Sequence, residues 1–432
     1  MNFQSKTSSS SSVVETSKPR LLGVLGPGLI SGASDDDPTA IATYSQAGAK
    51  FGYGLCWLML LVFPLMVVVQ QVSARIGRTT GNGLAGNIRR HYPPWLLNSA
   101  VGLLLIANTI QLSADLGIMG DALAMLIGGP RLLYVVLFGV LCVGLQVFMR
   151  YTRYVSILKW TTLSLLAYVA TVLLADVSWA DVAAGMIPAF SLDSDRITMI
   201  VAIFGAAISP FLFFWQSSQE AEDQRIKPER EPLIHAPHQA PHAIERIRLD
   251  TYVGMAVATF VGLSIMITAA ATLNAGGITE IRTSAEAAEA LRPAAGPLAM
   301  AVFSLGIIGT GLLAVPVLAG SAAYAIGEAR RWPVGLSRGP LEAKAFYGTV
   351  SLATLIGIGI NFSGIDPMQA LFWSAVINGV VAVPVMAVMM LMASKSEVMG
   401  EHTIPASLRI VGWIAVAIMV LGVIAMAATS LS

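Results

Sequence analysis

Long apolar runs recur along this chain, and they constrain its fold more than any other feature. A helix needs about 20 predominantly apolar residues to cross the hydrocarbon core of a bilayer. Charged residues make up only 12% of the chain, about half the share usual in soluble domains. The sequence therefore predicts an all-α polytopic membrane protein with about 11 transmembrane helices. These runs lie near residues 22–47, 52–74, 97–127, 131–149, 154–175, 198–220, 251–274, 297–327, 346–363, 367–393 and 408–430.

The distribution of Lys and Arg predicts how the chain is oriented. With the N-terminus in the cytoplasm, the inner segments hold about 19 of these residues and the outer loops about five. Cytoplasmic loops of multi-pass proteins carry such an excess of positive charge. We therefore expect a cytoplasmic N-terminus and a C-terminus on the outer side.

The first 20 residues differ in composition from the rest of the chain. They are polar and rich in serine, which predicts a disordered cytoplasmic tail. They contain no apolar core of the kind that a cleaved signal peptide needs. Residues 21–432 are then expected to form a single transmembrane domain. The short loops and the lack of a targeting sequence favour a bacterial inner membrane.

The first apolar run is interrupted by the sequence GASDDDPTA, which contains three consecutive aspartates. An ionisable side chain at bilayer depth is energetically costly, so it usually faces a partner or a cavity and carries function. Pro38 removes a backbone donor and disfavours helical geometry at Asp37. We expect the helix to break near Ser34–Asp37, where freed backbone carbonyls and the Asp37 carboxylate can bind a cation.

The sixth run contains a second interruption, at Ser209-Pro210. Membrane helices tolerate a single proline as a simple kink. Two prolines at equivalent positions, one of them beside three aspartates, instead favour two broken helices in an inverted repeat. We expect repeat one at about 22–175, repeat two at about 198–393 and an extra helix at about 408–430.

The residues around the two breaks favour a hard cation as ligand. Carboxylate and carbonyl oxygens suit Mg²⁺, Ca²⁺ or Mn²⁺ better than Cu(I) or a thiolate-bound zinc. Sodium and an organic cation stay open on chemistry alone. The transported ion is expected to be a substrate, and no separate cofactor is predicted.

Other polar residues inside apolar runs are candidates for the permeation pathway. Asp115 is the best of them, although an interhelical hydrogen bond explains it equally well. Asp35 and Asn378 are further candidates, and Asn378 can also bond a neighbouring helix. The loop HAPHQAPHAIE has three histidines, but its prolines favour a solvated loop over a metal site. No nucleotide-binding, nucleophile-elbow or metalloprotease motif occurs in the sequence, so neither an enzyme nor a nucleic-acid-binding protein is indicated.

The stretch GPGLISGASDDDPTAIATYSQAGAKFGYGLCW, followed by QQVSARIGRTTG, resembles the natural-resistance-associated macrophage protein (Nramp) family of divalent-metal transporters. The resemblance implies a LeuT-like 5+5 inverted repeat with broken helices 1 and 6 plus one extra helix. It also implies that Asp37 is the metal-binding aspartate and that Ser34 and Ala206 offer backbone carbonyls. Asp115 matches an aspartate that takes protons in proton-coupled members.

The chain departs from the family pattern at several positions. The family's binding asparagine is Ala40 here and its sixth-helix Met-Pro-His is Ser209-Pro210-Phe211. Replacing the methionine thioether by Ser209 hardens the site, and Ala40 leaves room for a retained water. Mg²⁺ dehydrates reluctantly and keeps several waters. The pattern therefore resembles the divergent Nramp-related branch that includes magnesium transporters. Ser209 is expected to contribute a hydroxyl or a water contact and Asp36 an outer carboxylate.

These expectations combine into one function and three alternatives. The sequence predicts import of a divalent cation, Mg²⁺ first and Mn²⁺ next, by alternating access and without obligatory proton coupling. The alternatives are a proton-coupled Mn²⁺/Fe²⁺ importer of the Nramp type, a cation or amino-acid symporter of the same fold, and a membrane metal sensor. The expected partners are the metal ion and membrane lipid, and the sequence leaves the oligomeric state open.

Overall fold

The computed structural model describes residues 31–32, 34–148, 165–188, 193–227 and 229–430. Within these ranges all regular secondary structure is helical, with no strand. Nine stretches of the described residues are long and apolar enough to cross a bilayer. The predicted fold class, an all-α polytopic membrane protein, is therefore confirmed.

Nine of the eleven predicted runs correspond to these nine stretches. The helices that form them are α4 (Cys56–Thr80), α6 (Pro94–Ile127), α7 (Arg131–Phe148), α11 (Ser194–Ala207) with α12 (Pro210–Ile226), α13 (Ala240–Ala269), α16 (Ala299–Arg330), α17 (Lys344–Ile360), α18 (Pro367–Ala393) and α20 (Ala406–Ser430). The first and fifth runs lie partly outside the described residues. Their described parts are α3 (Pro38–Phe51) and α9 (Leu166–Leu174).

Short helices connect the long ones. They are α5 (Leu84–His91), α10 (Trp179–Gly185), η2 (Pro237–Gln239), η3 (Ala270–Asn274), α14 (Ser284–Glu289), α15 (Arg292–Ala295), η4 (Gly296–Leu298), η5 (Asn361–Ser363) and α19 (Ser396–Met399). Several helices extend beyond the predicted apolar runs by a turn or more. The clearest case is α13, which begins at Ala240, whereas the apolar run starts near residue 251. The early turns of α13 are polar, so hydropathy alone misses them.

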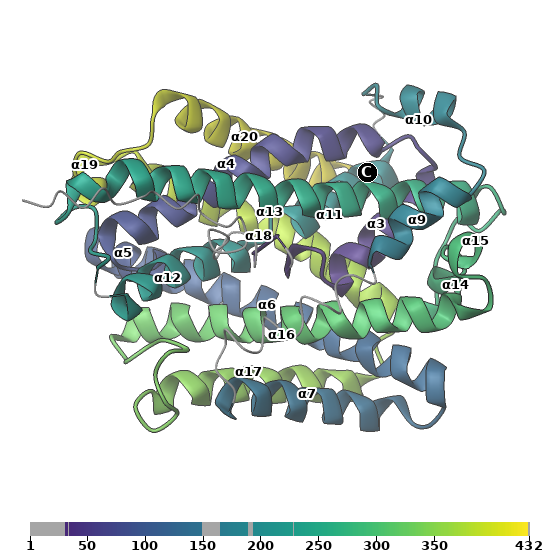
Figure 1. Cartoon of the computed structure of the whole chain (residues 1–432), viewed down its shortest axis with the longest axis horizontal. Helices are drawn as coiled ribbons and strands as arrows, with labels where there is room; N and C mark the ends of the chain where they lie inside the picture. Colours follow the sequence, from purple (N-terminus) through teal and green to yellow (C-terminus); the bar gives the residue numbers. More distant parts are fainter. Residues whose placement is uncertain (1–30, 33, 149–164, 189–192, 228, 431–432) are drawn as a thin grey trace, which may run out of the picture.

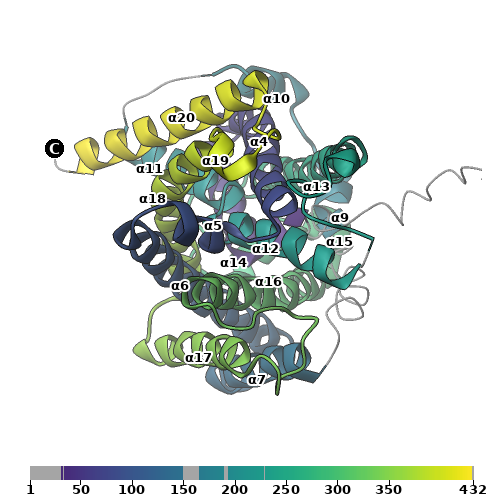
Figure 2. The ribbon, with the colours of Figure 1, turned by 90° about the vertical axis from the view of Figure 1, so that its left-hand side faces the viewer.

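The long helices form two packed groups with α18 between them. The first group contains α3, α4, α12 and α13, in which α13 packs on both α3 and α4 and α12 packs on α4. The second contains α6, α7, α16 and α17, which pack on one another, with α7 and α17 at the bottom edge of the bundle (Figure 1). The end-on view in Figure 2 shows the same separation, with α20 on the opposite side from α17. Equivalent spans of the two predicted repeats thus lie in the same group.

Small residues allow some of these helices to touch through their backbones. A Cβ atom on Gly205 of α11 would lie 1.9 Å from the carbonyl oxygen of Ala375 in α18, and one on Gly77 of α4 would lie 2.1 Å from that of Ser217 in α12. Lipid tails solvate apolar side chains as well as protein does, so close backbone contact is a main source of helix association in membranes.

The first predicted helix break is present. Ser34 and Asp35 are helical, the chain bends at Asp36 and Asp37, and α3 begins at Pro38. Asp37 has extended backbone geometry, with φ of −73° and ψ of 173°, and occupies the N-cap position. Proline is favoured at the first helical position because its missing N–H has no partner there in any case. The sequence Asp-Pro therefore stops one helix and starts another.

The second predicted break is also present. Helix α11 ends at Ala207 and α12 begins at Pro210, with Ile208 and Ser209 between them. Ser209 has extended geometry, with φ of −78° and ψ of 132°, as expected for a residue that precedes proline. Each of the two predicted repeats thus has a broken first helix.

Candidate cation site

Asp37 anchors the candidate site, and both of its carboxylate oxygens accept a hydrogen bond. The backbone N–H of Ala40 donates to Oδ1 at 2.8 Å, which caps the start of α3. The side-chain amide of Gln111, from α6, donates to Oδ2 at 2.5 Å. The carboxylate is only 3% exposed. It is therefore held in place from two sides by neutral donors.

Gln111 is itself held by a second amide. The Nδ2 group of Asn378, from α18, donates to Oε1 of Gln111 at 2.6 Å. Gln111 is 1% exposed and Asn378 is fully buried. Asn378 thus reaches both a neighbouring helix and, through Gln111, the predicted cation ligand. This chain of hydrogen bonds connects α3, α6 and α18 at the first break.

Asp115 lies beside the same break. The hydroxyl of Thr39 donates to Oδ1 of Asp115 at 3.0 Å and lies 3.4 Å from the hydroxyl of Ser374 in α18. Oδ2 of Asp115 is buried and has no hydrogen-bond partner among the described residues. The interhelical hydrogen bond expected for Asp115 is therefore observed. Its place on a permeation pathway stays a prediction.

The second break offers fewer groups to a ligand. The Ser209 hydroxyl donates to the carbonyl oxygens of Gly205 at 2.7 Å and Ala206 at 3.1 Å. It forms no side-chain cap on α12. The carbonyl predicted to bind the cation, that of Ala206, therefore already accepts one hydrogen bond, although a carbonyl oxygen has a second lone pair. The roles of Ala206 and Ser209 as cation ligands stay predictions.

The remaining predicted residues lie at the first break and are buried. Ser34 is 0%, Asp35 2% and Asp36 4% exposed. Within the described part of the chain, the hydroxyl oxygen of Ser34 and the Oδ1 atoms of Asp35 and Asp36 have no hydrogen-bond partner. No ion pair joins these aspartates to a described Lys or Arg. Buried charge without a partner is costly, so this break suits a positively charged ligand.

The described residues contain no group of three or more His, Cys, Asp and Glu side chains placed to hold a metal ion. The three histidines around the start of α13, His235, His238 and His242, are all exposed. A cation at the first break would thus depend on few carboxylates, supplemented by amide, hydroxyl and carbonyl oxygens and by water. Such a ligand set suits a hard ion that keeps part of its hydration shell.

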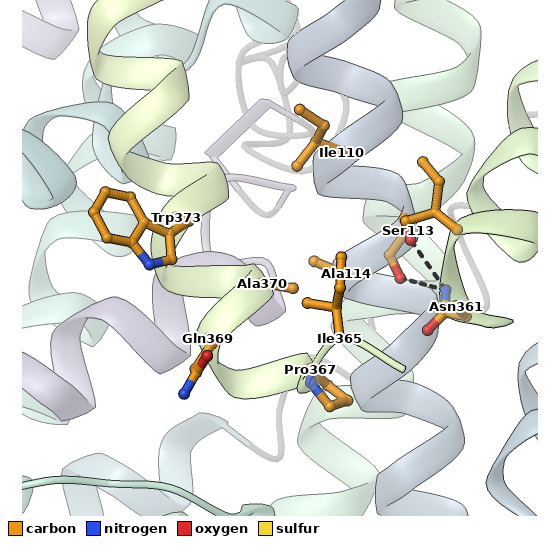
Figure 3. Close-up of a pocket in the computed structure, with 10 residues that line it drawn as sticks. Ile110, Ser113, Ala114, Asn361, Ile365, Pro367, Gln369, Ala370 and Trp373 are labelled. Atoms are coloured by element: carbon orange, nitrogen blue, oxygen red, sulfur yellow. Dashed lines mark hydrogen bonds between the residues drawn. The ribbon is translucent and has the colours of Figure 1, made fainter. Parts of the chain in front are cut away.

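A cavity of about 320 Å³ lies between α6 and the start of α18 (Figure 3). Most of its lining is apolar, with Ile110, Ala114 and Trp373 among the walls. Asn361 donates to the backbone and side-chain oxygens of Ser113 at its edge. None of the predicted site residues lines this cavity, so it is not part of the candidate cation site.

Sequence reasoning gave no role in the site to three residues, namely Gln111, Thr39 and Ser374, although Gln111 is one of the polar residues inside an apolar run. A usable signal was present, because Gln111 lies four residues before Asp115, and Ser374 lies four residues before Asn378. Residues four apart share one face of a helix. Two polar residues on one face of an otherwise apolar helix indicate a side that contacts polar groups of its neighbours.

Comparison with known proteins gives consistent results for sequence and for fold. The family described as natural resistance-associated macrophage protein-like matches residues 28–429. The divalent metal cation transporter MntH of Klebsiella pneumoniae is 26% identical over 423 residues, covering 95% of this chain and 96% of its own length. The same-named protein of Yersinia pestis is 28% identical over 428 residues, covering 94% and 96%.

Solved structures show the same fold. The manganese transporter of Eremococcus coleocola has a TM-score of 0.73 at 18% identity, covering 96% of this chain and 90% of its own. MhsT, solved in complex with L-phenylalanine, has a TM-score of 0.57 at 14% identity, covering 91% and 98%. These likenesses confirm the predicted LeuT-like arrangement. Since the family match spans almost the whole chain, this protein belongs to the Nramp family.

Proposed function

We propose that this protein imports a divalent metal cation across the membrane by alternating access, with Mg²⁺ as the preferred ion and Mn²⁺ next. The names of its relatives, divalent metal cation transporter and manganese transporter, support the ion class. The LeuT-like fold supports the transport mechanism, because broken helices at the membrane midplane form ion sites in such folds.

One observation carries the proposal more than any other, namely the burial of Asp37 at the break in the first helix. Its carboxylate accepts hydrogen bonds only from uncharged groups in the described chain. A buried carboxylate of this kind has a strong electrostatic demand for a cation. Asp37 supplies the main charge for the ion, with Asp36 and Asp35 adding negative potential nearby. Ser34 and Ala206 contribute carbonyl oxygens.

The preference for Mg²⁺ rests on the hardness of the groups around Asp37. The side chains linked to it by hydrogen bonds are amides, from Gln111 and Asn378. At the second break Ser209 replaces the thioether that the family pattern has there. Oxygen ligands favour Mg²⁺, whereas a thioether favours softer ions. The small side chain of Ala40 leaves space for a water that Mg²⁺ retains.

Import of a divalent cation needs no proton gradient. Moving two charges inward down about 100 mV releases roughly 4.6 kcal/mol, twice the single-charge value. Because each 1.4 kcal/mol corresponds to about tenfold in concentration, this energy supports a gradient of over a thousandfold. Uniport driven by the membrane potential is therefore sufficient.

The second candidate is a proton-coupled Mn²⁺/Fe²⁺ importer, and one observation favours it. Oδ2 of Asp115 is buried without a hydrogen-bond partner among the described residues, so it is available to take a proton. In this alternative Asp115 carries the proton that accompanies each metal ion.

Flux in proteoliposomes tests both candidates. The purified protein is reconstituted with dyes for Mg²⁺, Mn²⁺, Ca²⁺ and pH, under an inside-negative potential, with and without a pH gradient. Mg²⁺ entry without internal acidification is expected. Acidification that follows metal entry would favour the coupled importer, and binding without flux of any divalent ion would favour a metal sensor. Empty liposomes provide the control for leakage.

We also propose that the N-terminus lies in the cytoplasm of a bacterium. Residues 1–20, expected from their composition to form a disordered tail, lie outside the residues that the structure describes. The native cysteines, Cys56 and Cys142, are buried, so they give little background in thiol labelling. A cysteine placed by Ser10→Cys should resist a membrane-impermeant maleimide in spheroplasts and react after lysis. Reaction in intact spheroplasts would show that the N-terminus lies outside the cell, opposite to the proposed orientation.

A further inference from the structure

We propose that Gln111 and Asn378 form a pair of amides that reverse together when the cation binds, so that Gln111 becomes an oxygen ligand of the ion. This inference rests on the proposed function and extends it to two residues outside the helix breaks. In the structure the Gln111 amide presents N–H to Asp37, and in the ion-bound state it presents its carbonyl oxygen.

Asp37 determines the polarity of this chain of hydrogen bonds when the site holds no ion. An ionised carboxylate only accepts hydrogen bonds, so the Gln111 atom at 2.5 Å from its Oδ2 is the amide nitrogen. The other end of that amide, Oε1, then accepts from Nδ2 of Asn378 at 2.6 Å. The direction of donation runs from α18 through α6 to α3.

A cation on Asp37 reverses that polarity. Oδ1 caps α3 through the N–H of Ala40, so Oδ2 is the oxygen with the greater freedom to bind an ion. The N–H of Gln111 that faces Oδ2 carries partial positive charge and repels a divalent cation there. A half-turn of the terminal amide group places Oε1 toward the ion, since oxygen and nitrogen occupy nearly equivalent positions in that group. Amide oxygen is a ligand suited to Mg²⁺ and Ca²⁺.

Asn378 allows the reversal to occur without a net loss of hydrogen bonds between the two amides. Once Gln111 turns, its N–H faces Asn378, which must then present an oxygen. Oδ1 of Asn378 is buried and has no hydrogen-bond partner among the described residues. A half-turn of Asn378 therefore breaks only its bond to Gln111, and that bond forms again with donor and acceptor exchanged. The number of hydrogen bonds between the two amides is unchanged.

Infrared spectroscopy detects this change directly. Difference spectra of the purified protein with and without MgCl₂ should show a shifted side-chain amide carbonyl band. Gln111→Leu should remove that band and weaken Mg²⁺ binding, measured by calorimetry, by about tenfold or more, the loss typical of a bond to a charged group. Gln111→Met serves as a second variant of similar length. Gln369→Leu, at an exposed position on α18, is the matched control and should behave as wild type.

A double-mutant cycle tests the role of Asn378. Asn378→Asp has the shape of asparagine but accepts hydrogen bonds only, so it holds Gln111 with its oxygen toward the site in advance. We expect it to tighten Mg²⁺ binding about tenfold, whereas Asn378→Leu weakens it. In the Gln111→Leu background, Asn378→Asp should give no gain. A gain that persists there would mean that the added charge acts on the ion directly, and the amide pair would be rejected.

The outcomes separate this inference from the proposed function. If the wild type binds no divalent cation, the proposed function fails. If the wild type binds Mg²⁺ and Asp37→Ala does not, while Gln111→Leu and Gln111→Met bind as wild type and the carbonyl band is unchanged, only the amide reversal fails.

Discussion

The two helix breaks lie at equivalent places in the two repeats, yet their side chains form different kinds of hydrogen bond. At the first break, Asp37 and Thr39 form bonds to side chains of other helices, namely Gln111 and Asp115. At the second break, the Ser209 hydroxyl bonds only to carbonyls of its own chain segment in the bonds described above. The same backbone geometry thus supports a charged centre in one repeat and a backbone-bonded turn in the other.

This difference shows where the charge for a cation is concentrated. The first break has three adjacent buried aspartates, with Asp115 nearby. The second has no ionisable residue between Gly205 and Gln216. We infer that the first break determines whether an ion binds, and that the second tunes which ion is preferred. The predictions below test that division, beginning with the largest expected effect.

Removing the carboxylate at the first break should abolish transport. Asp37→Ala is expected to lower Mg²⁺ uptake in proteoliposomes by about a hundredfold or more, as expected for loss of a charged ligand. Glu280→Gln, at an exposed position, is the control. Normal uptake by a correctly inserted Asp37→Ala protein would remove Asp37 from the site.

Introducing sulfur at the second break should change selectivity without abolishing transport. Ser209→Met should raise the ratio of Mn²⁺ to Mg²⁺ uptake by about tenfold, because a thioether favours the softer ion. Ser209→Leu provides similar bulk without sulfur and should leave the ratio unchanged. An equal change in both variants would attribute the effect to side-chain size.

Breaking a link between helices at the first break should reduce stability. Thr39→Val removes the donor to Asp115 and leaves a buried carboxylate oxygen unpaired, at a cost of about 1–3 kcal/mol. Thermal unfolding in detergent should occur at a lower temperature. Thr43→Val removes a hydroxyl that bonds only to the Thr39 carbonyl of the same helix, at 2.8 Å, and should have less effect. Equal losses would contradict the importance of the Asp115 contact.

The smallest effect is expected for loss of the Ser209 hydroxyl. Ser209→Ala removes bonds to local carbonyls only, so Mg²⁺ uptake should change by less than about threefold. A loss as large as that of Asp37→Ala would show that Ser209 binds the ion directly, and the two breaks would then share the function equally.

The fold could be predicted from the sequence more completely than the contacts within the candidate site. The spans and both breaks followed from local features, since apolar runs and Asp-Pro or Ser-Pro pairs act on their own segment of chain. The pairing of Gln111 with Asp37 did not, because it depends on how α6 is rotated against α3. The polar start of α13 was missed for a related reason, since hydropathy identifies the membrane-embedded part of a helix and not its full length.

The contact between Gly205 and Ala375 has a consequence for motion. A Cβ atom on Gly205 would lie 1.9 Å from the carbonyl oxygen of Ala375, and one on Gly379 would lie 2.7 Å from that of Val201, so the backbones of α11 and α18 touch at two places. We expect the two helices to move together during transport, with the break at Ile208 and Ser209 separating them from α12. Asn378 directly precedes Gly379 in α18. Its side chain would then change position whenever α11 and α18 move together.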